Sequence, residues 1–254
     1  MLSPEELERY QRQIIIPGFG EEGQEKLKRA RVLVVGAGGL GSPGTIYLAA
    51  AGVGTLRIVD SDIVTLGNLN RQILHWTRDI GRNKIESAAE KLREINPEIK
   101  VETVNVKLTG ENARKIAQGY DLIVDAVDNL PTRYLLNRTA MDLKLPLFHG
   151  AVYGFQGQAM TILPDQTPCL MCLYRGASPR GKVPVIGVTP AVIASIQATE
   201  VIKYITGLGQ LLINRLLIYD GLNMKFQELK ISRDPFCTHC GTTNSSKSEL
   251  KTNE

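Results

Sequence analysis

Hydrophobic residues in the first part of the chain alternate between short runs and helical spacing. Short apolar or β-prone runs predict strands at 31–35, 55–60, 101–106 and 121–127. Between them, the spacing of apolar residues predicts helices at 42–52, 83–97, 111–118 and 131–144. Strands that alternate with helices are typical of the α/β class, so we predict a Rossmann-like, doubly wound and mainly parallel sheet.

The two ends of the first part carry other signals. Ser3 followed by Pro4, Glu5 and Glu6 predicts a capped helix that precedes the sheet. From about residue 148 the chain becomes glycine-rich and β-prone, and "HGAVYGFQGQAMTILP" predicts antiparallel strands that extend the sheet.

The remaining pattern completes a single domain. Residues 174–189 combine Gly, Pro, Ser and basic residues and predict a mobile crossover loop, which is followed by a helix at 191–207 and strands at 215–221 and 225–231. The tail from Thr242 has almost no apolar residue and is expected to be disordered. We therefore expect one domain over 1–241, with a nucleotide-binding half at about 1–147 and a second half at about 148–241.

Composition excludes several classes of protein. The chain has 254 residues, 43% of them hydrophobic and 22% charged, as in ordinary globular proteins. The formal net charge of +4 comes without a block of basic and aromatic residues, so nucleic acid is not expected as the main partner. No signal-peptide core opens the chain and no apolar run approaches the ~18 residues of a membrane span, so we expect a cytoplasmic protein without a membrane segment.

The stretch "VLVVGAGGLGSPG" predicts a nucleotide site. Gly36, Gly38 and Gly41 satisfy G-x-G-x-x-G directly after a predicted strand, and Asp60 lies 21 residues after Gly39 at the end of the next one. This fingerprint places a phosphate at a helix N-terminus and a carboxylate on a ribose hydroxyl. It specifies a nucleotide, and hydride transfer from NAD is one reaction that it allows.

A polar segment follows the second strand. Asn68, Asn70 and Arg71 lie where the far end of a nucleotide is expected, and Lys84 opens the following helix. Taken singly, Arg71 and Lys84 are as well explained as solvated surface residues. Together with the glycine fingerprint they favour binding of phosphates.

Asp128 follows the strand at 121–127 and points toward the same crevice. A carboxylate beside phosphates needs a cation between them, and magnesium binds through one or two carboxylates plus substrate phosphates. Asn129 comes next and is part of the same expected site. The alternative is that Asp128 only caps the helix that begins near Pro131. Asp125 is expected to be structural.

Every cysteine belongs to a C-x-x-C pair, Cys169 with Cys172 and Cys237 with Cys240. Two such pairs predict a tetrahedral four-thiolate zinc site, and a redox dithiol or reduced buried thiols are the alternatives. His239 is expected to be a bystander. His75 and His149 are expected to be hydrogen-bonded structural residues.

With these residues in place, the chain resembles the MoeB/ThiF family, bacterial and archaeal relatives of the ubiquitin-activating enzymes. The resemblance runs from Leu7 to Gly241. It is carried by the stretches "RYQRQI", "RVLVVGAGGLGS", "AAAGVGTLRIVD", "LGNLNRQILH", "IGRNKIESA", "DLIVDAVDN", "PCLMC", "IASIQATEVIK" and "FCTHCG".

The resemblance implies ATP-dependent adenylation of a small ubiquitin-like sulfur carrier protein, in molybdopterin or thiamine biosynthesis. The C-terminal Gly-Gly carboxylate of the carrier would attack the α-phosphate of ATP and expel pyrophosphate. The roles implied are phosphate approach for Gly39, ribose binding for Asp60, triphosphate binding for Asn68, Arg71 and Lys84, and placement of magnesium for Asp128. Arg12 would come from the neighbouring subunit of a homodimer, and the zinc site would be structural.

One departure from the family is visible. Members that form a covalent link with the carrier place a cysteine near "GKVPVIGV", where this chain has none. We therefore expect activation without an enzyme-bound thioester or persulfide. An NAD-dependent oxidoreductase and a non-catalytic scaffold that binds nucleotide and carrier are the other two functions that the chain allows.

Overall fold

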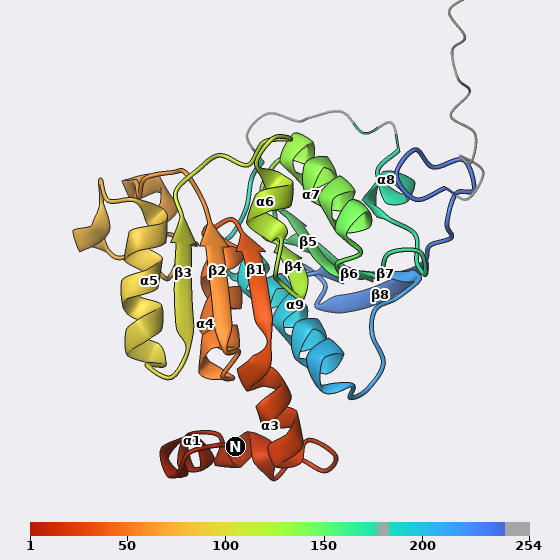
Figure 1. Ribbon diagram of the computed structural model, residues 1–254. Helices are drawn as coiled ribbons and strands as arrows, with labels where there is room; N and C mark the ends of the chain where they lie inside the picture. The colour runs from red at the N-terminus through yellow and green to blue at the C-terminus, as the bar shows by residue number, and fades with distance from the viewer. Residues whose placement is uncertain (176, 178–182, 242–254) are drawn as a thin grey trace, which may run out of the picture.

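Eight strands form one sheet in the computed structural model, which describes residues 1–175, 177 and 183–241 (Figure 1). The strand order is β3-β2-β1-β4-β5-β6-β7-β8, in which β1 to β5 pair in parallel and β5 to β8 pair in antiparallel fashion. The strands are β1 (Arg31–Val35), β2 (Thr55–Val59), β3 (Lys100–Val104), β4 (Leu122–Asp125), β5 (Leu147–Tyr153), β6 (Gln156–Ile162), β7 (Arg215–Asp220) and β8 (Lys225–Lys230). The predicted class and the antiparallel extension are confirmed.

Helices cover both faces of the sheet because its strands are apolar on both sides. In β1, Val32 and Val34 pack into one core, whereas Leu33 and Val35 pack into a second core on the opposite face. The first core receives α3 (Gly20–Arg29), α4 (Gly41–Ala50), α5 (Lys84–Ile95) and α9 (Val188–Thr206). The second receives α6 (Ala113–Ala117), α7 (Leu130–Leu143) and α8 (Leu170–Leu173), and in Figure 1 α6 and α7 lie in front of the sheet.

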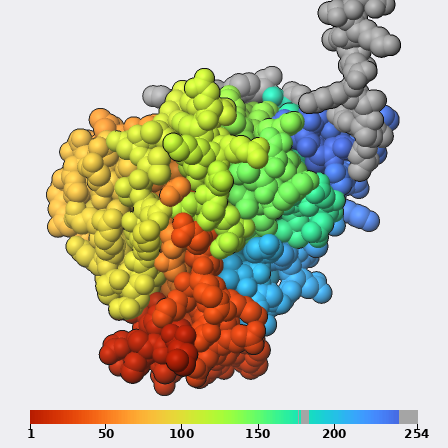
Figure 2. Space-filling model, in the orientation of Figure 1, coloured from red at the N-terminus to blue at the C-terminus, as the bar shows by residue number. Residues whose placement is uncertain are grey.

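The N-terminal segment forms three helices where the sequence predicted one. The capping box of Ser3 and Glu6 is present at the start of α1 (Pro4–Arg9), and α2 (Gln11–Ile14) and α3 follow. The chain turns between α2 and α3 at Gly18 and Gly20, whose φ angles are +81° and +57°. These helices lie at the amino ends of the parallel strands, at the bottom of Figures 1 and 2.

One close backbone approach fixes this end of the molecule. A Cβ at Gly54, just before β2, would lie 1.7 Å from the carbonyl oxygen of Lys28 in α3. The amide of Gly54 donates to the carbonyl of Leu27 at 2.9 Å. Only glycine allows this contact between the end of α3 and the start of β2.

Several boundaries differ from the prediction. β4 ends at Asp125, two residues early, α9 begins at Val188, and the short helix α8 was not predicted. Of the expected crossover loop, residue 176 and residues 178–182 lie outside the described residues, and so does the expected disordered tail at 242–254. Within the described part, no helix has the length and apolarity needed to cross a membrane.

Candidate active site

The glycine turn lies between β1 and α4, at the carboxyl edge of the parallel strands. Gly36 has a φ angle of +103°, and a Cβ there would lie 2.4 Å from the carbonyl oxygen of Ala126. A Cβ at Gly41 would lie 1.9 Å from the carbonyl oxygen of Gly36. The turn therefore packs backbone against backbone, which only glycine permits at these two positions.

The amides of this turn are free. In the described part of the chain, the N–H groups of Gly38, Gly39, Leu40 and Gly41 donate to no backbone carbonyl and to no side chain. Unpaired N–H groups at the start of a helix carry the positive end of its dipole and bind anions, phosphate above all. The geometry expected from the fingerprint is present.

Asp60 contacts the turn directly. Its Oδ2 accepts a hydrogen bond from the amide of Ala37 at 2.8 Å, and its Oδ1 accepts from the amide of Asp62 at 2.8 Å. The carboxylate is partly exposed beside the turn, at the end of β2. This position is the one expected for a ribose ligand.

Arg71 lies against the same turn. The 3₁₀ helix η1 (Leu66–Asn68) precedes it, and Asn68 closes that helix by accepting from the amide of Thr65 at 3.0 Å. A Cβ at Gly39 would lie 3.6 Å from Cγ of Arg71 and 3.3 Å from Cγ of Pro190 in α9. Half-buried between these elements, Arg71 is not a free surface residue.

Lys84 is buried as the first residue of α5. Its residue is 5% exposed, and Nζ donates to Oδ2 of Asp62 at 2.8 Å. The alternative interpretation as a solvated surface lysine is wrong. A buried ammonium paired with an exposed carboxylate is suited to anion binding.

Gln72 was missed by the sequence reasoning. It is 4% exposed, and its Oε1 has no hydrogen-bond partner, alone among buried side-chain atoms of the described residues. Its Nε2 is 3.6 Å from the position of a Cβ on Gly38. A buried polar atom without a partner indicates a polar ligand or water at that point, and the only signal in the sequence was its place next to Arg71.

Asp128 is exposed in the loop after β4. Asn129, not Asp128, caps α7, since its Oδ1 accepts from the amide of Thr132 at 3.0 Å. The capping alternative for Asp128 is therefore wrong. Nδ2 of Asn129 lies 3.3 Å from Oδ1 of Asp128, so the two side chains project together.

A buried ionic network stabilises the loop after β4 that carries Asp128. Arg133 donates through Nε to Oδ2 of Asp125 at 2.9 Å and through Nη2 to the carbonyl of Val127 at 2.7 Å. His149 Nδ1 is 2.7 Å from the same carboxylate, and its Nε2 is 2.8 Å from the hydroxyl of Tyr174. Burial by itself raises the pKa of Asp125, but the charge of Arg133 and the bond to His149 outweigh it and lower that pKa. The structural roles predicted for Asp125 and His149 are confirmed.

His75 is also structural in the sense expected, since both ring nitrogens are bonded. Nδ1 lies 3.0 Å from Oγ of Ser87 and Nε2 lies 2.9 Å from the carbonyl oxygen of Ala37.

Arg12 does not join the other predicted residues within this chain. It lies on α2, exposed to solvent, and the helices before and after α2 in the chain, α1 and α3, lie at the bottom of Figure 1, whereas the glycine turn lies at the opposite ends of the strands. A chain that used Arg12 in this site would have to take it from another copy.

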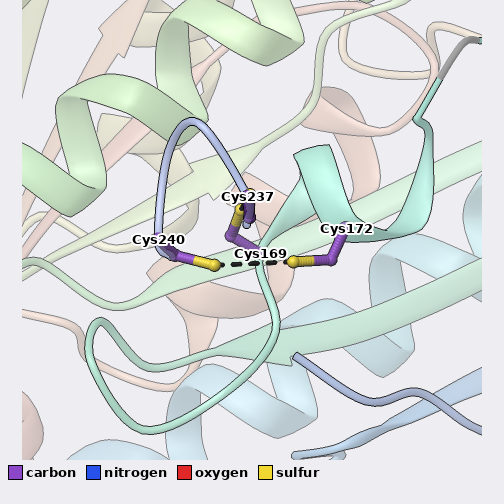
Figure 3. A group of neighbouring side chains, drawn as sticks. All are labelled: Cys169, Cys172, Cys237 and Cys240. Carbon is purple, nitrogen blue, oxygen red and sulfur yellow. Dashed lines mark hydrogen bonds between the residues drawn. The ribbon is translucent and has the colours of Figure 1, made fainter. Parts of the chain in front are cut away.

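The four cysteines converge between α8 and the segment after β8 (Figure 3). All four Sγ atoms lie within 4.8 Å of one another, with Cys169 and Cys237 3.6 Å apart and Cys172 and Cys240 3.5 Å apart. Zinc–thiolate bonds of about 2.3 Å place tetrahedral sulfur atoms about 3.8 Å apart, so this cluster fits zinc. His239 lies outside the cluster, its Nδ1 2.7 Å from Nδ2 of Asn137.

Burial raises the pKa of the Cys169 thiol to about 11 and also raises that of Cys240. For Cys237, burial is outweighed by the backbone amides of His239 and Cys240, which lower its pKa. A metal bound here would therefore displace protons from the two thiols of raised pKa.

A comparison with protein families matches residues 10–239 to the ThiF family. The chain belongs to the ThiF family. The match covers the glycine turn, Arg71, Lys84, Asp128 and every cysteine except Cys240, and it disfavours the oxidoreductase interpretation.

Two curated relatives are similar in sequence to this ThiF-family chain over nearly its whole length. The sulfur carrier protein adenylyltransferase of Thermus thermophilus is 48% identical in an alignment of 248 residues, and the match covers 93% of this chain and 92% of that protein. The SAMP-activating enzyme E1 of Haloferax volcanii is 46% identical, over 94% of this chain and 91% of its own. A crystal structure of E. coli MccB with ATP superposes with a TM-score of 0.79 at 26% identity, over 87% of this chain and 69% of that one.

Proposed function

We propose that this protein adenylates the C-terminal Gly-Gly carboxylate of a small ubiquitin-like sulfur carrier protein with ATP. A carboxylate oxygen of the carrier forms a bond to the α-phosphorus, the bond from that phosphorus to the bridging oxygen breaks, and pyrophosphate leaves. The supporting observation is the row of unpaired amides at Gly38–Gly41, with Arg71 against it and the buried cation Lys84, in a chain of which 93% matches an adenylyltransferase.

Each residue of the site has a role in this reaction. The free amides and the cations Arg71 and Lys84 neutralise the phosphates as two anions are brought together, which is where most catalytic help is needed. Asp60 accepts from the ribose hydroxyls and Asn68 supports the polyphosphate. A general base is not needed, because the carboxylate of the carrier is already ionised at pH 7.

Two metals complete the proposal. Asp128 would hold magnesium, which supplies charge neutralisation at the phosphates when bound, and Asn129 lies beside it in the same site. Cys169, Cys172, Cys237 and Cys240 would hold zinc, and four thiolates leave it no open position for a substrate, so its role is structural.

The position of Arg12 bears on the oligomeric state, and the crossover loop bears on the reaction product. Because Arg12 lies at the far end of the sheet, we place it in the site of a second copy, which makes the working enzyme a homodimer. No cysteine occurs in 174–189, so the product is the carrier adenylate without a covalent carrier–enzyme link. We place this cytoplasmic reaction in molybdopterin or thiamine biosynthesis.

The test is ATP–pyrophosphate exchange that depends on the carrier. Small proteins ending in Gly-Gly are purified from the same cell by their binding to this chain, and each is added with ATP, magnesium and labelled pyrophosphate. Exchange with an intact carrier, and none with a carrier that lacks its last glycine, supports the proposal. Binding of nucleotide and carrier without exchange would instead support a non-catalytic scaffold.

A further inference from the structure

His75 reaches the glycine turn from the interior of the molecule. It is 3% exposed, lies 38 residues from the turn, and its Nε2 is 2.9 Å from the carbonyl oxygen of Ala37. A carbonyl oxygen accepts hydrogen bonds and cannot donate them, so Nε2 carries a proton. Oγ of Ser42, also buried, lies 3.3 Å from the same oxygen. The carbonyl of Ala37 is therefore held toward the interior.

The other ring nitrogen is held by a buried ionic group. Nδ1 of His75 lies 3.0 Å from Oγ of Ser87, and that oxygen accepts from Nζ of Lys91 at 2.9 Å. Lys91 in turn donates to Oδ2 of Asp79 at 2.6 Å, and neither side chain of this pair is more than 3% exposed. Burial lowers the pKa of His75, with the charges of Lys84 and Lys91 acting in the same direction. Because the Ala37 carbonyl can only accept, the neutral form of the ring has its proton on Nε2.

The contact of His75 also sets the direction of the Gly38 amide, because Ala37 and Gly38 share one peptide bond. The carbonyl of Ala37 and the amide of Gly38 share a planar trans peptide, so their C=O and N–H bonds point in opposite directions. With the carbonyl held inward, the amide of Gly38 points outward, and it donates to no acceptor in the described part of the chain. The amide of Ala37 is fixed as well, since it donates to Asp60 at 2.8 Å.

We propose that His75 is a positioning residue for nucleotide binding, which aims the Gly38 amide at a phosphate by holding the Ala37 carbonyl from behind. This inference rests on the proposed use of ATP, but not on the carrier. Without His75 the Ala37 carbonyl keeps only its longer contact with Ser42, so the first of the four free amides is aimed less firmly.

Two substitutions and one control separate positioning from general support of the fold. His75→Leu removes the donor, whereas His75→Gln keeps an amide N–H that reaches the place of Nε2. Leu92→Ala, a core substitution within α5, destabilises the fold without touching the turn. Affinities for ATP and for adenosine are measured by equilibrium competition on each full-length protein, without carrier.

We expect His75→Leu to lower the affinity for ATP about tenfold, as the loss of one hydrogen bond to a charged group does. The affinity for adenosine should stay unchanged. His75→Gln recovers most of that loss, and Leu92→Ala leaves the ratio of the two affinities unchanged. Equal weakening of ATP and adenosine, or a Gln variant as weak as the Leu variant, overturns the inference. ATP binding in the wild type without carrier-dependent exchange overturns the proposed function and leaves this inference standing, whereas a wild type that binds no ATP overturns both.

A measurement on the unmodified protein covers the case in which His75→Leu does not fold. Long-range proton–nitrogen NMR of the three histidines reports which ring nitrogen carries the proton. We expect His75 to be the neutral Nε2–H form at pH 7, and a neutral Nδ1–H form would contradict the inference.

Discussion

Lys84 and Asp62 form an ion pair in which the two partners differ sharply in exposure. Nζ and Oδ2 lie 2.8 Å apart, and the lysine side chain is 6% exposed against 67% for the aspartate. The cation is thus fixed by the fold beside the glycine turn, while the carboxylate projects into solvent. Under the proposed function, a phosphate that replaced Asp62 would not require Lys84 to move.

From this asymmetry we expect Lys84→Ala to lower carrier-dependent ATP–pyrophosphate exchange by about 10² or more, as removal of a transition-state charge donor does. Asp62→Asn leaves the ammonium in place and should cost less than about tenfold. Both rates are read from the same exchange assay at saturating carrier. Equal losses in the two variants would show that the pair, and not the lysine, is what the reaction needs.

Asp128→Ala should abolish exchange and leave the fold intact. Asn129 supplies the cap of α7, so Asp128 has no structural bond that the helix depends on. Thermal unfolding should shift by no more than about 2 °C, as for an ordinary surface substitution. Asp142→Ala, an exposed aspartate of the same helix, is the matched control and should retain the exchange rate. Near-normal exchange in Asp128→Ala would refute the magnesium assignment.

The position of Arg12 predicts complementation between two inactive proteins. Arg12→Ala and Asp128→Ala chains should each be inactive alone, and mixing them should restore about a quarter of the wild-type activity. Random exchange makes half of the dimers hybrid, and each hybrid has one intact site of two. No recovery, with subunit exchange verified by native mass spectrometry, argues against a shared site.

The thiol cluster predicts one zinc ion per chain. Cys237→Ser should lose that zinc and unfold the region around α8, because a structural zinc contributes on the order of 10 kcal/mol to folding. His239→Ala should keep it, since His239 bonds to Asn137 and not to the cluster. Metal content is measured by elemental analysis and local unfolding by hydrogen exchange.

Alkylation of the zinc-loaded protein should leave ATP–pyrophosphate exchange intact. A carrier–enzyme adduct on one of the four cysteines would contradict both the zinc role and the absence of a covalent link.

Asp79 predicts how stability depends on pH. Burial by itself raises its pKa, but hydrogen bonds from Lys91 and from the amide of Trp76 outweigh it and lower that pKa to about 2. Because the folded pKa is below the unfolded value of about 3.9, the stabilisation is present above about pH 4 and is lost as the pH falls through 2. Asp79→Asn should therefore lower the free energy of unfolding by about 2 kcal/mol or more at pH 7, and the difference should shrink toward pH 2.

Urea unfolding at several pH values measures this difference. Glu90→Gln, which removes a half-buried partner of Arg82, is the control and should change stability by less than about 1 kcal/mol. A gap between wild type and Asp79→Asn that persists unchanged at pH 2 would contradict the assignment.

The sequence predicted the order of strands and helices because each buried strand and each amphipathic helix leaves a local period. The split of the N-terminal helix was missed, because it depends on left-handed backbone at Gly18 and Gly20 that no periodicity records. The only cap of α7 considered from the sequence was Asp128, whereas the structure uses Asn129, because both residue types cap helices equally well and the sequence alone does not separate neighbours.

Within the site, the sequence marked the residues that carry charge and missed those that act through the backbone. Arg71, Lys84 and Asp128 stand out as charges in a nucleotide motif. Gln72 and His75 are recognised only when the glycine turn is folded over them, because the contact of His75 is to a carbonyl 38 residues away.

Two close-packed glycines limit which substitutions this chain can accept. Gly41 sits in the nucleotide turn and Gly54 lies at the opposite end of the sheet, yet a Cβ would meet a carbonyl oxygen at 1.9 Å in the first case and at 1.7 Å in the second. In a saturation library both positions should therefore accept glycine alone. An invariant glycine in this molecule thus reports how closely two backbones approach, and by itself it does not mark the place where the chemistry happens.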